Sequence, residues 1–127
     1  IVLVRQYRNA LDRMTLEIPA GCRDSITENT AVCAARELEE ETGYKSSQLE
    51  FLLSLKTTVA FCDEFIDVYL ATELELGKQQ FDEGEEIEVE EYEPEELLNM
   101  IYMGKIQDSK TVAGILAYCN KYHHRME

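Results

Sequence analysis

Hydrophobic and polar positions alternate along the chain in short runs, which are separated by stretches with a helical period. The strand-like runs cover residues 1–7, 15–18, 49–58, 64–75 and 87–91. Helical periodicity covers residues 29–42 and 94–103, and a last helix begins at Asp108 or Ser109. Strands, a central helix, further strands and two closing helices predict an α/β fold, an α/β/α sandwich with a mixed β-sheet.

The central helix combines a small apolar face with a dense group of carboxylates. Its apolar positions are Ala31, Ala34, Ala35 and Leu38. Glu37, Glu40 and Glu41 stand at i, i+3 and i+4, so they project from one face. Such a cluster suits a hard divalent cation, since Mg²⁺ prefers oxygen ligands. The alternative is an acidic face that only contacts water.

The ends of this helix have their own signals. Its beginning could be capped by Ser25, with Glu28 three residues later as the partner in a capping box, or by Thr27. Gly43 stands where a helix commonly ends in a left-handed conformation.

Composition narrows the class of protein. The 127 residues predict one domain over 1–127, and a formal net charge of −14 argues against general nucleic-acid binding. No apolar run approaches the ~20 residues of a membrane span. The four cysteines lie far apart, which argues against zinc and disulfides and indicates reduced thiols in the cytoplasm. The chain opens on a strand-like run without an initiator Met, so we expect N-terminal strands to be missing from this numbering.

The stretch from Gly21 to Tyr44 resembles the Nudix box, G-x5-E-x7-R-E-U-x-E-E-x-G-U, where U is a bulky apolar residue. The matching positions are Glu28, Arg36, Glu37, Leu38, Glu40, Glu41, Gly43 and Tyr44. Gly21 lies seven residues before Glu28 instead of six, which adds one residue to a loop. The resemblance implies the Nudix α/β/α sandwich.

Segments outside the box resemble the ADP-ribose pyrophosphatase subfamily. They are residues 4–8 (VRQYR), 16–21 (LEIPAG), 61–64 (FCDE), 82–89 (DEGEEIEV) and 105–111 (KIQDSKT). Residues 58–60 (TVA) depart from the subfamily's usual S-P-G. The resemblance implies Mg²⁺-dependent cleavage of ADP-ribose into AMP and ribose 5-phosphate, with Mn²⁺ as a substitute, in a homodimer. Alternatives are another nucleoside diphosphate sugar as substrate, or a non-catalytic Nudix module that binds a nucleotide and regulates.

The same resemblance implies roles for residues in and beside the box. Glu37 and Glu41 match the family's main metal ligands, and the main-chain carbonyl of Ala20 matches a further one. Glu40 lies close to them as a candidate catalytic carboxylate. Arg36 is expected to orient the glutamates and partly neutralise them.

The remaining candidates lie outside the box. Glu83 and Glu85 are alternatives for the general base, because a carboxylate can accept the proton of a cation-bound water. Arg5 and Arg8 offer forked donors for phosphates or ribose, but their spacing along a strand turns them to opposite faces. Further substrate-binding candidates are Glu17, which could instead cap a turn, and Glu64.

Overall fold

The computed structural model describes residues 1–79 and 86–123. The strands are β1 (Val2–Arg8), β2 (Arg13–Glu17), β3 (Tyr44–Lys56), β4 (Phe65–Leu76) and β5 (Glu88–Glu91). The helices are α1 (Thr30–Thr42), α2 (Pro94–Tyr102) and α3 (Ser109–Tyr118), and a π-helical turn (Cys119–His123) follows. Each predicted strand and helix is therefore present, with shifted ends.

The strands form two antiparallel ladders in the described part of the chain, in the orders β2-β1-β5 and β3-β4. Short connections join β1 to β2 and β3 to β4, and such connections force antiparallel pairing. The mixed sheet that we expected therefore takes an antiparallel form over residues 1–79 and 86–123. Val4 sits opposite Glu17 on β2 and opposite Val89 on β5, so β1 is the central strand of its ladder.

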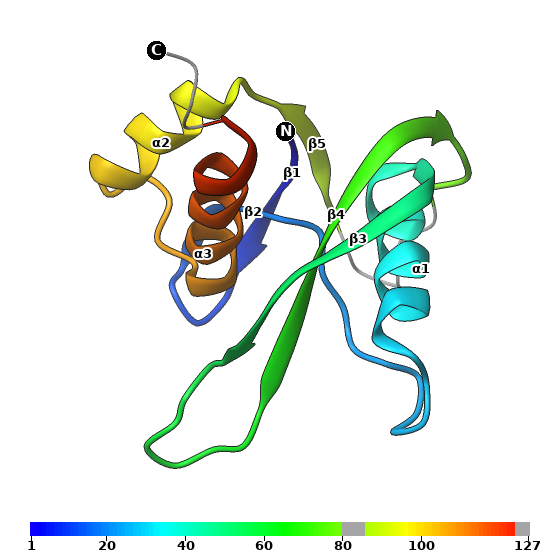
Figure 1. The fold of residues 1–127 in the computed structure, drawn as a ribbon. Helices are drawn as coiled ribbons and strands as arrows, with labels where there is room; N and C mark the ends of the chain where they lie inside the picture. Colours follow the sequence, from blue (N-terminus) through cyan, green and yellow to red (C-terminus); the bar gives the residue numbers. More distant parts are fainter. Residues whose placement is uncertain (80–85, 124–127) are drawn as a thin grey trace.

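Helices flank the β3–β4 ladder on both sides, which gives the expected α/β/α layering (Figure 1). Helix α1 packs on β3 and β4, while α3 contacts the same strands from the layer that also holds α2. At Gly114 of α3, an added Cβ would lie 3.5 Å from both Ile18 and Val68. A small residue there lets α3 approach the end of β2 closely.

The main core joins β1 and β2 to the two C-terminal helices. Its buried members are Leu3, Leu16, Leu97, Ile106, Ile115 and Cys119. Each large aliphatic side chain contributes roughly 1.5–3 kcal/mol through burial. This packing fixes the N-terminal turn of α3 beside the end of β2.

None of the helices in the described ranges is long and apolar enough to span a membrane.

The element ends agree with the local signals at Gly43 and Asp108, and differ from them at the start of α1 and of β3. Gly43 has a φ of +79° and donates its N–H to the Glu39 carbonyl at 2.8 Å, as expected of a glycine that ends a helix. The cap of α1 is Asn29, whose side chain accepts from the Ala31 N–H at 2.7 Å, so the expected caps at residues 25–28 were wrong. Asp108 caps α3. Strand β3 begins at Tyr44, five residues earlier than predicted, because the polar residues 44–48 pair with the end of β4.

Candidate functional site

The carboxylates of Glu37 and Glu41 lie against the backbone of residues 20–21. The Ala20 N–H donates to Glu41 Oε1 at 3.2 Å, and Glu41 is only 6% exposed. A Cβ added to Gly21 would meet the Glu37 carboxylate carbon at 2.0 Å. A side chain at this position would have to displace the end of the Glu37 side chain. The structure thus brings together the three residues expected to bind metal. Glu37 and Glu41 come from α1, and Ala20 comes from the segment that follows β2.

Arg36 lies beside these carboxylates and makes several ionic contacts. Its guanidinium donates to Glu37 at 2.9 Å and to Glu28 at 3.0 Å, and lies 3.5 Å from Asp24 and 3.9 Å from Glu40. Burial acts most strongly on the pKa of Arg36 and lowers it, but Glu28 and the neighbouring acids raise it overall. The side chain is therefore a cation held among acids, at the position where the resemblance predicts a residue that orients the glutamates.

Glu28 supports the loop that contains the additional residue. Its carboxylate accepts from the Asp24 N–H at 2.8 Å as well as from Arg36. Arg23 closes the same loop by donating to the Ile26 carbonyl at 2.8 Å. The longer loop is thus closed by its own hydrogen bonds, and the contacts between Arg36 and the box glutamates are kept.

The donor set fits a hard divalent cation. Mg²⁺ takes oxygen ligands and is commonly held by one or two carboxylates together with substrate phosphates. Glu37 and Glu41 supply two carboxylates, and the Ala20 carbonyl supplies a further oxygen. Glu40 is adjacent, with a side chain 35% exposed. Within residues 1–79 and 86–123, no three His, Cys, Asp or Glu side chains converge as a complete metal-binding group.

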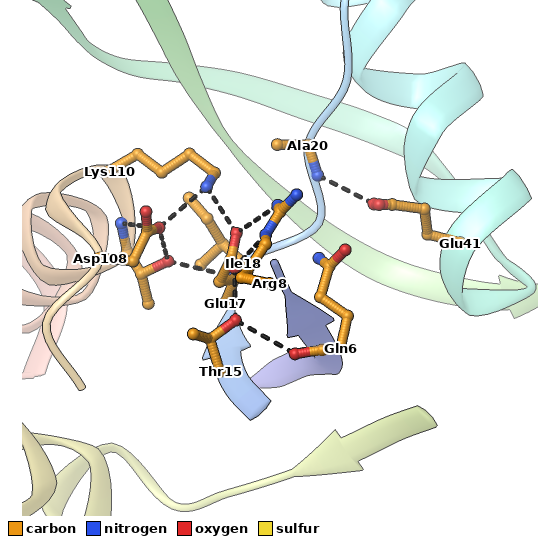
Figure 2. Close-up of polar contacts among 10 residues, drawn as sticks. Gln6, Arg8, Thr15, Glu17, Ile18, Ala20, Glu41, Asp108 and Lys110 are labelled. Atoms are coloured by element: carbon orange, nitrogen blue, oxygen red, sulfur yellow. Dashed lines mark hydrogen bonds and ion pairs between the residues drawn. The ribbon is translucent and has the colours of Figure 1, made fainter. Parts of the chain in front are cut away.

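Glu17, for which we expected either a substrate contact or a turn cap, lies in a buried ion network (Figure 2). Arg8 donates to both of its oxygens at 2.8 Å, Lys110 donates at 2.8 Å and Thr15 at 2.6 Å. Burial, the largest single influence, raises the pKa of Glu17, but these donors together lower it to about 2. Both carboxylate oxygens of Glu17 therefore accept two hydrogen bonds each from other residues of the protein.

A shallow cleft of about 410 Å³ opens beside this network, between the β1–β2 connection and the segment that joins α2 to α3. Its basic lining residues are Arg8, Arg13, Lys105 and Lys110. None of the α1 carboxylates lines it. The cleft is therefore separate from the candidate metal ligands.

The other predicted site residues lie apart from one another. Arg5 pairs with Glu90 on β5, where Tyr92 also contacts both side chains. Arg5 and Arg8 thus reach different partners, as their spacing on one strand indicated. Glu64 is exposed directly before β4, and the Thr57 hydroxyl donates to it at 2.6 Å. Glu83 and Glu85 lie outside the described residues.

Two groups of polar residues at the site were missed by the sequence reasoning. Lys110 and Asp108 belong to the Glu17 network, and the resemblance of residues 105–111 was the only signal for them. At the end of α1, Glu39 accepts from the Lys78 N–H at 3.0 Å, and Gln79 donates to the Glu41 carbonyl at 2.9 Å. No local pattern marks Glu39 or Gln79, because their contacts join distant segments.

Comparison with known proteins identifies the family. A sequence profile of the NUDIX domain matches residues 1–114. The chain is 42% identical to a methanol dehydrogenase activator of Bacillus methanolicus and 38% identical to an ADP-ribose pyrophosphatase of Bacillus subtilis; each alignment covers 91% of this chain and 63% of the relative. A GDP-mannose pyrophosphatase of Cronobacter sakazakii is 34% identical over 88% of this chain and 62% of its own length. The chain thus spans less than two thirds of the length of these relatives.

A solved structure supports the fold. The crystal structure of an ADP compounds hydrolase superposes with a TM-score of 0.82, at 17% identity, over 96% of this chain and 68% of that one. At this identity the likeness concerns the fold alone. The profile match over residues 1–114, with relatives at 42% and 38% identity over 91% of the chain, shows that the chain belongs to the NUDIX domain family.

Proposed function

We propose that this chain hydrolyses the pyrophosphate bond of ADP-ribose, giving AMP and ribose 5-phosphate with the help of a divalent cation. The observation that carries the proposal is the approach of the residue 20–21 backbone to Glu37 and Glu41. The 38% identity to an ADP-ribose pyrophosphatase supports the choice of substrate. The flanking segments that resemble this subfamily point the same way.

In this proposal, Glu37, Glu41 and the Ala20 carbonyl hold Mg²⁺, or Mn²⁺ in its place. The cation, when bound, neutralises charge on the pyrophosphate and lowers the pKa of a coordinated water. Arg36 keeps Glu37 in position through its 2.9 Å contact and offsets the repulsion among the box carboxylates. Glu40 lies next to this group as a candidate catalytic carboxylate, and Glu83 or Glu85 accepts the proton of the attacking water.

In this proposal, the substrate is contacted by side chains that remain partly exposed to solvent. Arg8 is the better candidate of the two strand arginines, since its side chain is 47% exposed while Nε and Nη2 bind Glu17. The Arg5 side chain is 33% exposed and bound to Glu90, so a role at the substrate requires exchange of that partner. Glu17 acts by holding Arg8, and Glu64 remains an exposed acceptor directly before β4.

Two other functions have specific support. A GDP-mannose pyrophosphatase at 34% identity favours another nucleoside diphosphate sugar as substrate. The relative at 42% identity is named as an activator of another enzyme, which favours a regulatory Nudix module. The box glutamates are all present in this chain, and this favours hydrolysis over binding alone.

The test is a product analysis with Mg²⁺ for ADP-ribose, ADP-glucose and GDP-mannose, each repeated with EDTA. We expect kcat/KM for ADP-ribose to exceed the others by at least about tenfold, a difference of ~1.4 kcal/mol in transition-state stabilisation. If kcat/KM for ADP-glucose or GDP-mannose equals that for ADP-ribose, the activity on another nucleoside diphosphate sugar would be favoured instead. Turnover that persists in EDTA would refute the metal-dependent chemistry, and no turnover on any of the three would favour the regulatory module.

We also propose a homodimer in the cytoplasm. Large apolar side chains stand exposed on the β3–β4 hairpin, including Phe51, Val59 and Phe61, and a second copy could cover them. All four cysteines are free thiols, which is typical of a reducing compartment. Light scattering coupled to size exclusion measures the oligomeric state directly.

A further inference from the structure

The first turn of α3 is tied to the end of β2 by buried polar contacts (Figure 2). Lys110 Nζ donates to Glu17 at 2.8 Å and to Asp108 at 2.9 Å, and its side chain is only 12% exposed. Thr111 is fully buried; its Oγ1 accepts from the Ile18 N–H at 3.0 Å and donates to Asp108 at 2.6 Å. One turn of α3 thus holds both the side chain of Glu17 and the main chain of Ile18.

The same segment continues directly to the α1 carboxylates. Pro19 follows Ile18, and its ring holds its own φ at about −65°, so one of the few backbone dihedrals between Ile18 and Ala20 cannot rotate. Ala20 then donates to Glu41 at 3.2 Å, and Gly21 lies against the Glu37 carboxylate. If Ile18 shifted relative to α3, the backbone of Ala20 and Gly21 beside Glu37 and Glu41 would therefore shift with it.

We propose that Lys110 and Thr111 are positioning residues, which set the place of the Ala20–Gly21 backbone against Glu37 and Glu41 and thereby determine how tightly the site holds a divalent cation. The proposal rests on the function proposed above, in which the Ala20 carbonyl, Glu37 and Glu41 hold this cation. Mg²⁺ demands near-ideal octahedral geometry at about 2.0–2.1 Å. Displacing one of its oxygen ligands by a fraction of an ångström therefore weakens binding.

The two residues differ in what their removal would do. Without Lys110, the buried carboxylate of Glu17 keeps Arg8 and Thr15 but loses one charged donor, so stability and position both suffer. Thr111→Val keeps the side-chain shape and removes the hydroxyl, which leaves the Ile18 N–H without its acceptor. Thr111→Ser restores a hydroxyl at the same place. Thr111 is therefore the cleaner probe of position.

The experiment titrates Mn²⁺ into the protein without substrate and follows free Mn²⁺ by electron paramagnetic resonance. We expect Thr111→Val and Lys110→Met to weaken Mn²⁺ binding by about tenfold or more, a typical loss when a partner that orients a ligand is removed. Thr111→Ser should recover most of the affinity. Lys105→Met is the matched control, since Lys105 is an exposed lysine that precedes α3 and lies outside the Glu17 network; its affinity should stay within about twofold, well below the change expected at an orienting partner.

Hydrogen exchange separates positioning from general destabilisation and from failure of the proposed function. In Thr111→Val, the Ala20 amide should exchange faster while the Cys33 amide, bonded to the Asn29 carbonyl at 3.1 Å within α1, keeps its rate. Equal acceleration of both amides, or unchanged Mn²⁺ affinity in Thr111→Val, would overturn the proposal. If the wild-type protein cleaves no nucleotide sugar, the proposed hydrolysis fails, but the Mn²⁺ and exchange comparisons still decide whether Thr111 positions Ala20.

Discussion

The charge on Glu17 should make a measurable, pH-dependent contribution to the stability of the protein. Its carboxyl has a pKa of about 2 in the folded protein against a reference value of 4.5. Each unit of pKa difference corresponds to ~1.36 kcal/mol, so the ionised form contributes up to about 3 kcal/mol to the free energy of unfolding. Because Arg8, one of the donors, is half exposed, solvent screening reduces this to about 2–3 kcal/mol.

The sign follows from the direction of the shift. A carboxyl with a lowered pKa in the folded state stabilises the protein above the pKa of the unfolded chain, and this contribution is lost as the pH falls toward the folded value. The stabilisation by Glu17 should therefore be complete near pH 7, decline below about pH 5, and be nearly gone at about pH 2. Glu17→Gln resembles the protonated form at every pH.

The assay is urea unfolding of the wild-type protein and Glu17→Gln at several pH values from 7 downward, with Glu95→Gln as the control. Glu95 is exposed in the first turn of α2 and takes no part in the Glu17 network. We expect the variant to be less stable by about 2–3 kcal/mol at pH 7, and the gap to close as the pH falls below about 5. A gap that is absent at pH 7, or that stays constant to pH 3, would refute the assigned charge contribution.

Three further predictions concern α1 and its contacts. Glu37→Gln or Glu41→Gln should lower kcat by orders of magnitude with the fold retained, because the change removes a charged oxygen and also relieves like-charge repulsion; near wild-type turnover would remove that residue from the ligand set. Gly21→Ala should weaken Mn²⁺ binding at nearly unchanged stability, since the new Cβ displaces the flexible end of Glu37; unchanged affinity would count against the close approach. Glu39→Ala should speed exchange of the Lys78 amide, whereas Glu39→Gln keeps an acceptor and should not; equal rates in both variants would contradict this contact.

Much of α1 was predictable because its signals are local. The i, i+3 and i+4 spacing of Glu37, Glu40 and Glu41 requires only that the segment be helical. Gly43 ends the helix through its own left-handed conformation. The cap of α1 could not be chosen from the sequence because Ser25, Thr27 and Asn29 all suit that position, and the loop's own hydrogen bonds decide which one begins the helix.

Strand ends were less predictable for a related reason. Residues 44–48 have no apolar alternation, yet they belong to β3 because the end of β4 supplies main-chain partners. Pairing is a property of two segments, and the pattern of one segment does not contain it.

The sequence by itself determined the α/β class, the family and the row of carboxylates on α1, because each is written in residue types at fixed short spacings. Only the tertiary structure decided which charges are already paired. Glu17 meets Lys110 across 93 positions of the chain, and Arg5 meets Glu90 across 85. A charged side chain on a strand suits a substrate as well as an ion pair, and the packing of the β1–β2 ladder against α3 and β5 selects the ion pair.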